Sequence, residues 1–417
     1  MQSCARMSAS EENPLSIRDS VLEVLQKHDV IDCEISLEGT TEKGDGYLGD
    51  ITFIHVTAVK ENGKSKNYDM VVKAGKPSKE LRNKFPVRVA FEREIHMYSK
   101  VFPSFQQFVK EKKVEPFQFV AECFGTLLSE DMEIIFCQNL KKIGYELHDR
   151  FTPCNMDHMK LTLESYGKYH AISFAMREQQ PEIFKKLSEM ECVWSAFAAS
   201  ETFPPMLKQV EKHLYEILEE SKEIEMLRKF KERFTGDFEQ TWRNLITAYE
   251  ERSVITHGDC WNNNFMFKYD TTDFTKSSPT KVVMLDFQIS KLASPVLDLA
   301  YHICAVIAPT DSANLKELLG IYYRSLSDYL RQLGSNPDIA FPYSSLIEQW
   351  RKYSLIGIFF VGMVLPIILL DKSDAMNVED FDENTFMDLT KKVQGKHKTQ
   401  LNERIIAAFR LVLEEKV

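Results

Sequence analysis

The sequence predicts an α+β protein with two lobes, and three observations lead to this fold class. Its 417 residues are enough for two domains or for one large domain with two lobes. Short β-branched runs separated by turn residues fill the first 135 or so residues. From about residue 140 onward, apolar residues recur at helical spacing instead. We therefore expect a flexible N-terminal tail (1–14), a small β-rich lobe (15–139) and a large, mainly helical lobe (140–417).

The small lobe is expected to contain several strands and one clear helix. Runs rich in β-branched residues predict strands at 51–59 (ITFIHVTAV), 70–73 (MVVK) and 133–137 (EIIFC). A helix is predicted between the second and third strands, from about Pro86 to Lys100, because its apolar residues are spaced four, four and three apart and so form one stripe. These residues are Val87, Phe91, Ile95 and Tyr98.

The large lobe is predicted to be helical, with one β-rich island. Segments such as LTLESYGKYHAISFAMRE have helical periodicity, whereas FMFKYD and KVVMLD flank a polar loop within 265–286. The run from Leu355 to Leu370 has sixteen residues without a charge and contains Pro366. Because a bilayer span needs roughly 20 apolar residues, a buried helix is a better interpretation of this run than a membrane segment.

Composition excludes several classes of protein. The formal net charge of −10 argues against a nucleic-acid-binding protein, which needs a basic stripe, and against docking on an anionic membrane. The eight cysteines are scattered without CxxC spacing and are too dilute for a disulfide scaffold. The first residues, MQSCARMSASEENP, lack the apolar core of a secretory signal. We therefore expect a cytoplasmic monomer with neither a nucleic-acid nor a membrane partner.

The most informative motif is HGDCWNNN at 257–264. Asp259 and Asn264 are five residues apart, as in the HxDxxxxN catalytic loops of phosphoryl-transfer enzymes. In such a loop the aspartate orients or accepts the proton of a substrate hydroxyl, and the asparagine reaches a magnesium ion on the phosphates. Asp286 follows the strand VVML and is the second carboxylate expected for that metal. Alone, each aspartate is better explained as a turn or strand-end residue, but their order and spacing together favour phosphoryl transfer with ATP and Mg²⁺.

A glycine motif precedes the first predicted strand. Gly44, Gly46 and Gly49 form a GxGxxG pattern, whose dinucleotide-binding version must open a helix. Here a β-branched run follows, which favours a strand–loop–strand flap over the phosphates of a nucleotide. An ordinary glycine-rich hairpin turn explains the motif equally well when it is taken by itself.

Lys73 and Glu94 are the candidates for an ion pair beside the phosphates. Lys73 ends the apolar run MVV, as the phosphate-pairing lysine does in the V-A-I-K motif. Glu94 lies on or beside the apolar stripe of the predicted helix, whereas Glu92 points away. A carboxylate on a buried face needs a cationic partner, and Lys73 supplies one.

With these residues assembled, the chain resembles the ecdysteroid-kinase-like family, also called CHK kinase-like, over nearly its whole length. The most specific matches are THGDCWNNNFMF (256–267), MLDFQ (284–288) and SPVLDLAYHI (294–303). The resemblance implies a bilobal protein-kinase-like fold related to choline and aminoglycoside kinases. It also implies ATP-dependent phosphorylation of a hydroxyl on a small molecule, and some relatives are linked to steroid-hormone inactivation and detoxification.

The resemblance also implies a role for each motif residue. Asp259 becomes the catalytic base, Asn264 and Asp286 the magnesium ligands, and Lys73 and Glu94 the ion pair. His257 becomes a structural histidine of the loop, and Asp298 the buried aspartate that braces it.

One departure from the family lies in the connection between the lobes. The family has Glu-Asp-Leu where this chain has Gln138, Asn139 and Leu140. The resemblance implies that backbone groups here bind adenine, so we expect Gln138 and Leu140 to contact ATP in spite of the two lost charges.

The acceptor is expected to be a small-molecule alcohol and not a protein. Asp298 comes only twelve positions after Asp286, which leaves no room for an activation segment with an A-P-E element. The helical segment from about 145 to 255 is expected to form the walls of the acceptor pocket, and the many Phe, Tyr and Met residues slightly favour an apolar acceptor such as a steroid. His170 is either a pocket residue or, as we prefer, a packed core histidine.

Two alternatives to an active kinase for an apolar alcohol stay open. One is a catalytically inactive, kinase-like binding module, which the complete set of motif residues disfavours. The other is a choline-type or aminoglycoside-type kinase with a cationic acceptor, which would need an acidic rim around the pocket.

Overall fold

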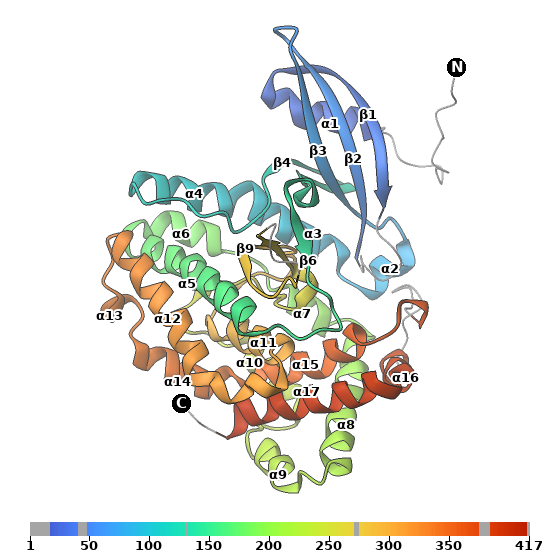
Figure 1. Ribbon diagram of the computed structural model, residues 1–417, viewed down its shortest axis with the longest axis vertical. Coiled ribbons are helices and arrows are strands. Elements are labelled where there is room, and N and C mark those ends of the chain that lie inside the picture. Colours follow the sequence, from blue (N-terminus) through green and yellow to red (C-terminus); the bar gives the residue numbers. More distant parts are fainter. Residues whose placement is uncertain (1–16, 41–47, 131, 271–274, 375–383, 415–417) are drawn as a thin grey trace.

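The computed structural model describes residues 17–40, 48–130, 132–270, 275–374 and 384–414. A small antiparallel sheet lies at one end and a larger body of helices at the other (Figure 1). The predicted α+β class, with a small β-rich and a large helical lobe, is confirmed. The tail expected at 1–14 lies outside the described residues.

The sheet of the small lobe has five strands in the order β1-β2-β3-β5-β4, and all neighbours are antiparallel. The strands are β1 (Val30–Thr40), β2 (Gly49–Lys60), β3 (Ser65–Gly75), β4 (Cys123–Ser129) and β5 (Met132–Gln138). The three predicted strands fall within β2, β3 and β5. Alternate residues of β2, Ile54, Val56 and Ala58, are fully buried in the core that the sheet shares with α1 (Ile17–Leu25).

The helical region between β3 and β4 is longer than the sequence predicts. It contains α2 (Lys79–Lys84), α3 (Val87–His96), the π-turn η2 (Met97–Val101) and α4 (Phe102–Glu111). The prediction of one helix ending near Lys100 is therefore wrong at its C-terminal end. Pro103 has no amide hydrogen to donate, but it lies in the first turn of α4, where none is needed, and the wider π-turn before it accommodates the interruption.

The large lobe is mostly helical. Its helices are α5 (Met156–Gln179), α6 (Pro181–Ser188), α7 (Val193–Ala198), α8 (Phe203–Glu220), α9 (Ile224–Glu232), α10 (Phe238–Thr247), α11 (Val296–Val306), α12 (Leu315–Gln332), α13 (Pro337–Ala340), α14 (Tyr343–Tyr353), α15 (Leu355–Ile368), α16 (Thr385–Lys392) and α17 (Gly395–Leu413), with the short turn η3 (Leu140–Ile143) before them. The lobe boundary expected between residues 139 and 140 falls where β5 has ended and η3 begins.

The predicted β-rich island at 265–286 forms β8 and β9, which take part in one of two small sheets of the large lobe. One has the order β6-β8-β9, and the other pairs β10 with β7. Their strands are β6 (Tyr145–Leu147), β7 (Val254–Ile255), β8 (Phe265–Tyr269), β9 (Pro279–Met284) and β10 (Leu292–Ala293), with the turn η4 (Asn262–Asn264) before β8. These strands carry the two motif segments, 257–264 and 284–288, to one place.

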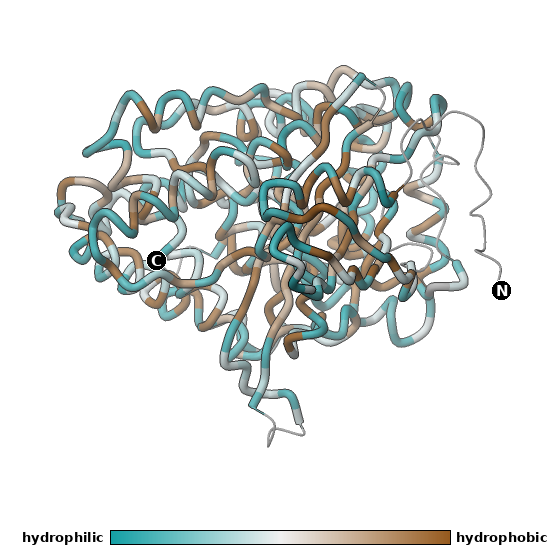
Figure 2. The backbone as a smooth tube through the Cα atoms, turned by 90° about the horizontal axis from the view of Figure 1, so that it is seen from above, coloured by the Kyte–Doolittle hydropathy of each residue, from teal (hydrophilic) through white to brown (hydrophobic). Residues whose placement is uncertain are grey.

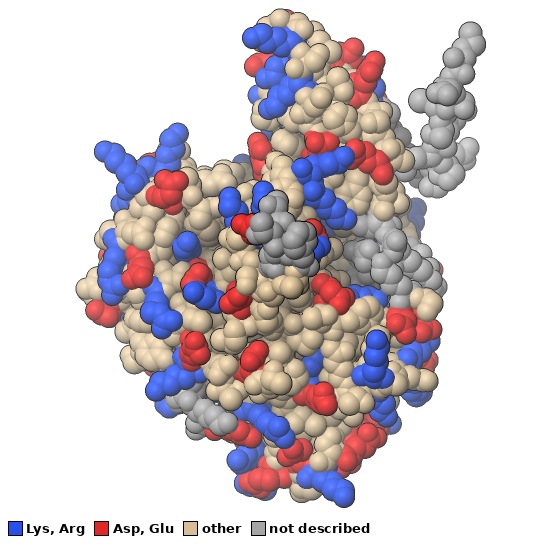
Figure 3. Space-filling view, viewed as in Figure 1, with Lys and Arg blue, Asp and Glu red and all other residues tan. Residues whose placement is uncertain are grey.

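The apolar run at Leu355 to Leu370 forms the buried helix α15, as predicted, and packs against α11, α8 and α17. Among the described helices, none is by itself long and apolar enough to cross a membrane, although the bent pair Pro337–Tyr353 and Leu355–Ile368, at 55°, reaches that length and composition together. In Figure 2 the hydrophobic stretches concentrate toward the middle of the view. On the face shown in Figure 3, basic and acidic side chains are interspersed.

Candidate active site

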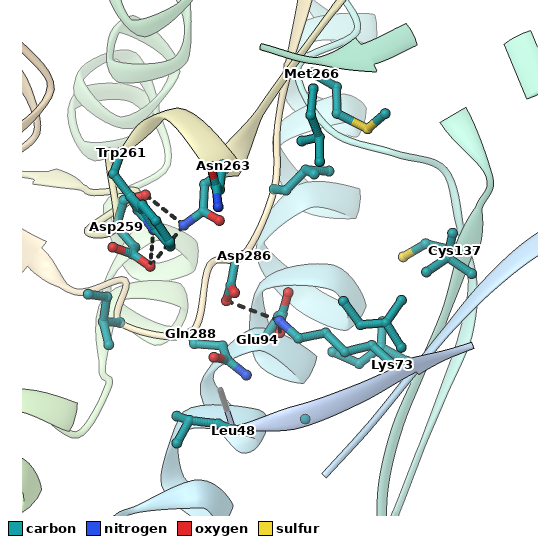
Figure 4. A pocket seen from close by; sticks show the side chains of 18 of the residues that line it. Leu48, Lys73, Glu94, Cys137, Asp259, Trp261, Asn263, Met266, Asp286 and Gln288 are labelled. Carbon is teal, nitrogen blue, oxygen red and sulfur yellow. Dashed lines mark hydrogen bonds and ion pairs between the residues drawn. The ribbon is translucent and has the colours of Figure 1, made fainter. Parts of the chain in front are cut away.

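A cavity of about 460 Å³ lies between the sheet and the helical lobe. Both lobes line it, and Figure 4 shows side chains from the sheet, from α3 and from the 257–288 region converging on it. Of the predicted site residues, the lining includes Gly49, Lys73, Glu94, Gln138, Leu140, Asp259, Asn264 and Asp286. The fold therefore brings residues that are more than 200 positions apart in the chain to one site.

On the small-lobe side of the cavity, Lys73 forms ion pairs with two carboxylates. It lies on β3 between Ile51 of β2 and Ile135 of β5. Its Nζ is 2.7 Å from Oε2 of Glu94 on α3 and 3.0 Å from Oδ1 of Asp286. Burial disfavours the charged form of Lys73, but the two carboxylates outweigh burial and raise its pKa, so the lysine stays protonated.

Glu94 is almost fully buried, as the apolar stripe of its helix predicts. Burial raises the pKa of Glu94 and the adjacent Lys73 opposes that rise. Glu92, which the helical spacing places on the other side, is about half exposed and pairs with Arg88 instead.

Replacing Lys73 by methionine is expected to affect both stability and turnover. Removing one partner of a buried ion pair costs about 3–5 kcal/mol, because the other charge is left unpaired. We expect a lower melting temperature, weaker Mg-ATP binding and loss of phosphoryl transfer, measured by calorimetry, titration and product analysis.

The double variant Lys73→Met/Glu94→Leu separates these effects, since an apolar pair restores packing without restoring a phosphate-binding charge. Lys66→Met, on an exposed position of the same strand, is the control. Normal turnover in the double variant would exclude a role for Lys73 at the phosphates.

Asp286 stands two residues after β9 and turns toward the cavity. Its φ is +62°, a left-handed conformation that Asp and Asn adopt more readily than other non-glycine residues. The amide of the preceding residue, Leu285, donates to the carbonyl of Asn264 at 2.8 Å, which joins the two predicted metal-binding segments.

The donor atoms at this place fit magnesium. Asp286 offers a carboxylate. The Asn264 side chain donates two hydrogen bonds through Nδ2, and these leave its amide oxygen unengaged. Hard oxygen ligands of this kind, completed by phosphate oxygens and water, are those that Mg²⁺ prefers.

Asp259 is held by three donors. Its Oδ1 accepts from the Tyr301 hydroxyl at 3.0 Å, and its Oδ2 accepts from Nε1 of Trp261 at 3.2 Å and from Nδ2 of Asn264 at 2.8 Å. Burial, together with the nearby Asp286, raises the pKa of Asp259 to about 7 in spite of these hydrogen bonds. The carboxylate is thus fixed in orientation and able to take up a proton near neutrality.

Asp298, in the first turn of α11, is hydrogen-bonded to the backbone of the 257–264 loop. Its fully buried carboxylate accepts from the backbone amides of His257 at 2.7 Å and Gly258 at 2.9 Å. Burial tends to raise the pKa of Asp298, but the hydrogen bond from His170 and the other donors lower it, so the group is anionic. Gly258 has φ +94°, and a Cβ there would lie 2.6 Å from the carbonyl oxygen of Ile289, so only glycine fits.

The two histidines near this carboxylate are fully buried and hydrogen-bonded. His257 is buried, contacts the Tyr166 hydroxyl through Nδ1 at 2.8 Å and the Leu285 carbonyl through Nε2 at 2.7 Å. Burial lowers the pKa of His257, so the ring is neutral. His170 lies 3.1 Å from Asp298 and 3.0 Å from the Tyr322 hydroxyl and is fully buried outside the cavity, so the core interpretation is confirmed and the pocket alternative is wrong.

The predicted nucleotide-contact residues are placed only in part. Gly44 and Gly46 lie outside the described residues, but the flanking β1 and β2 are antiparallel neighbours, as a flap requires. Gly49 begins β2 at the cavity, and a Cβ there would lie 2.7 Å from the Phe91 ring. Gln138, Asn139 and Leu140 line the cavity, and the Asn139 side chain also caps η3 by accepting from the Lys141 amide. Their contacts with ATP stay predictions.

The apolar side of the cavity contains residues that the sequence motifs do not single out. It is lined by apolar side chains of α7, α8 and α15, namely Trp194, Phe197, Phe203, Met206, Phe360, Met363, Val364 and Ile367. Of these helices, α7 and α8 belong to the segment from about 145 to 255 that is predicted to form the pocket walls. The helix α15 lies outside that segment and also lines the cavity.

Tyr301 connects this apolar surface to the catalytic loop. Its ring stacks on Phe360 with the centroids 4.2 Å apart, while its hydroxyl donates to Asp259. Tyr301 is three residues after Asp298 on α11, so the two side chains lie on the same face of that helix. This spacing is the signal by which the sequence could have indicated Tyr301.

No curated protein matches the sequence. Solved structures to which the chain is similar include a macrolide 2′-phosphotransferase from Brachybacterium faecium (12% identity, 93% of this chain and 97% of that chain, TM-score 0.31). Another is a protein assigned as a fructosamine-3-kinase from Haemophilus somnus 129PT (11% identity, 90% of this chain and 97% of that chain, TM-score 0.36). Both TM-scores are low, and the assignment of this chain to a family rests on the family match alone.

The sequence profile of the ecdysteroid kinase-like family matches residues 43–335, which is more than half of the chain and includes every described motif residue. The match confirms the resemblance that the catalytic-loop motif and the DFQ segment indicate, and with it the kinase-like fold. The chain belongs to the ecdysteroid kinase-like family.

Proposed function

We propose that this chain transfers the γ-phosphoryl group of ATP, in the presence of Mg²⁺, to a hydroxyl of a small, apolar molecule. Family membership supports the coarser statement, a small-molecule kinase. The observation that carries the finer proposal is the composition of one cavity, which holds the Lys73–Glu94–Asp286 cluster, the oriented Asp259 and a broad apolar wall.

Each polar residue has a task in this reaction. Lys73 binds phosphate oxygens of the nucleotide, and its pairing with Glu94 keeps the ammonium group in place. Asp286 and Asn264 would hold magnesium, which neutralises charge on the phosphates. Asp259 accepts a hydrogen bond from the acceptor hydroxyl and takes its proton as the phosphoryl group is transferred.

An apolar acceptor is supported by the side chains around Asp259. Among the described lining residues the carboxylates are Glu94, Asp259 and Asp286, and each of them is engaged by Lys73 or by the donors of the catalytic loop. A cationic acceptor of the choline or aminoglycoside type would need further carboxylates at the rim. The aromatic rings could bind a quaternary ammonium by cation–π contact, and we keep that acceptor as the second candidate.

An inactive binding module is disfavoured by the geometry. Lys73, Glu94, Asp259, Asn264 and Asp286 all line the same cavity, and Lys73 and Glu94 form the ion pair that kinase-type phosphoryl transfer uses. A protein that had lost the reaction would have no reason to keep all of them together.

The test combines nucleotide binding with an acceptor screen. Mg-ATP is expected to raise the melting temperature, since a ligand that binds the folded state stabilises it, and metal-free ATP is expected to do so much less. Incubation with γ-labelled ATP and a panel of ecdysteroids, plant alcohols and aminocyclitols, read by mass spectrometry, is expected to give phosphorylated apolar alcohols. No stabilisation at millimolar Mg-ATP would argue for the binding module, and phosphorylated aminocyclitols alone would argue for the cationic acceptor.

A substitution in the apolar wall tests the acceptor side separately. Val364→Asp places a charge among apolar side chains, and we expect the KM of an apolar alcohol to rise about tenfold or more, with the Kd of Mg-ATP unchanged. Ile339→Asp, at a largely exposed residue of α13, is the matched control. An unchanged KM in Val364→Asp would place the acceptor elsewhere.

A further inference from the structure

Two cysteines face each other in the sheet beside the nucleotide cavity. Cys123, the first residue of β4, is the register partner of Cys137 near the end of β5. Of the seven described cysteines, these two alone are opposed in a strand register, and neither is bonded to another cysteine.

The hydrogen bonds around the pair show which kind of register it occupies. The amide of Gln138 donates to the carbonyl of Glu122 at 2.8 Å, so the bond joins the residue after Cys137 to the residue before Cys123. That pattern is typical of a non-hydrogen-bonded pair, in which the Cα atoms approach to about 4.5 Å and the side chains project to the same face, and a register shift of the β-bulge kind follows between Cys123 and Gly125. A disulfide needs Cα atoms about 4.4–6.8 Å apart, so the backbone can accept the bond without moving far.

The two thiols are reachable from different cavities. Cys137 lines the nucleotide cavity, as Figure 4 shows. Cys123 lines a separate groove of about 910 Å³ between α4 and the segment 113–123, and Tyr98 borders both spaces. Both cysteines are partly exposed, in contrast to the buried Cys33, Cys154, Cys260 and Cys304. An oxidant can therefore reach Cys123 without entering the nucleotide site.

We propose that Cys123 and Cys137 form a reversible disulfide under peroxide, and that this bond weakens nucleotide binding in the adjoining cavity. The second part rests on the proposed function, whereas the first does not. The contact between the thiols supports the assignment of roles: the hydrogen bond from Cys137 lowers the pKa of Cys123, which makes it the better nucleophile, while the same contact and burial raise the pKa of Cys137.

The chemistry balances with hydrogen peroxide as the oxidant. The sulfur of Cys123 attacks one peroxide oxygen, the O–O bond breaks, and the leaving hydroxide takes the thiol proton as water, which leaves a sulfenic acid. The sulfur of Cys137 then attacks the sulfenic sulfur, the S–O bond breaks, and a second water leaves with the Cys137 proton. The two thiols lose two electrons in total, which reduce the peroxide, and a dithiol reductant reverses the reaction by exchange.

The bond would alter the nucleotide cavity because of where it lies. Bonding the two sulfurs at about 2.05 Å fixes the Cys137 side chain, which lines the cavity, against Cys123. The next residue, Gln138, and Leu140 after it also line the cavity, so the bond constrains the segment that is expected to contact the nucleotide.

The experiment reads the bond and its consequence separately. The full-length protein is treated with hydrogen peroxide, blocked with an alkylating agent and digested. Trypsin leaves both cysteines in one peptide, 114–141, which should be lighter by two hydrogens and carry no alkyl group. Further cleavage after Glu130 and Glu133 separates the cysteines, so that their peptides stay joined only through the disulfide. Cys123→Ser should abolish the joined product, and Cys192→Ser, at the partly exposed cysteine before α7, should not.

Nucleotide binding is then measured on reduced, oxidised and re-reduced protein. We expect oxidation to raise the Kd of Mg-ATP about tenfold, and dithiothreitol to restore it. Cys123→Ser, which lies outside the nucleotide cavity, should bind as the reduced wild type does in all three states.

Each outcome decides one part of the proposal. If peroxide oxidises other cysteines while Cys123 and Cys137 are still alkylated as free thiols, the proposed disulfide is wrong. A joined product with unchanged affinity would overturn its effect on the cavity. A reduced protein that binds no Mg-ATP would overturn that effect together with the proposed function, while a joined product would still uphold the disulfide.

Discussion

Asp286→Asn is expected to abolish phosphoryl transfer while leaving the fold intact. Asparagine matches aspartate in size and tolerates the left-handed backbone at this position, where φ is +62°. The change removes the negative charge that would hold magnesium and that lies 3.0 Å from Nζ of Lys73. Losing a charge that organises the transition state costs about 10²–10³-fold or more in turnover.

The metal dependence of binding is the sharper measurement for this variant. We expect Asp286→Asn to weaken the binding of Mg-ATP much more than that of metal-free ATP, as measured by titration with and without a chelator. Asp328→Asn, at an exposed position of α12, controls for the loss of one surface carboxylate. Near-normal activity in Asp286→Asn would show that the metal is held elsewhere.

Asp259→Asn is expected to lower kcat and leave nucleotide affinity almost unchanged. The amide can accept from Trp261 and Asn264 on one side and donate to the Tyr301 oxygen on the other, so the loop keeps its shape. What is lost is the ability to take a proton, and general-base assistance is worth about 10²–10⁴-fold. Because this interaction belongs to the transition state, kcat and kcat/KM should fall together.

Tyr301→Phe is the informative comparison for Asp259→Asn. It removes one hydrogen bond to the carboxylate but keeps the ring that stacks on Phe360, so a much smaller loss of kcat is expected. Steady-state kinetics with an acceptor from the screen, together with direct binding of a non-hydrolysable ATP analogue, separate the cases. If Asp259→Asn lost nucleotide binding and kept single-turnover chemistry, the assignment of the base would be wrong.

The motif residues could be predicted from the sequence because their constraints are local. The spacing of Asp259 and Asn264 reflects one short loop, and the position of Glu94 follows from the period of one helix. The same holds for the strand β3, which carries Lys73, and for the helix α15, because both depend on residues close together in the chain. The end of the α3–α4 region was missed because a π-turn has no distinctive side-chain pattern.

Lys73, Glu94, Asp259, Asn264 and Asp286 could thus be named in advance, together with the α+β class, since periodicity and loop spacing are properties of neighbouring residues. Only the tertiary structure decided that α15 lines the apolar side of the cavity, that Tyr301 contacts both Phe360 and Asp259, and that Cys123 faces Cys137. The cysteine pair depends on the register of β4 against β5, and a shift of one residue would turn one thiol to the opposite face. Register and helix packing are set by the burial of many distant side chains at once, which no local spacing records.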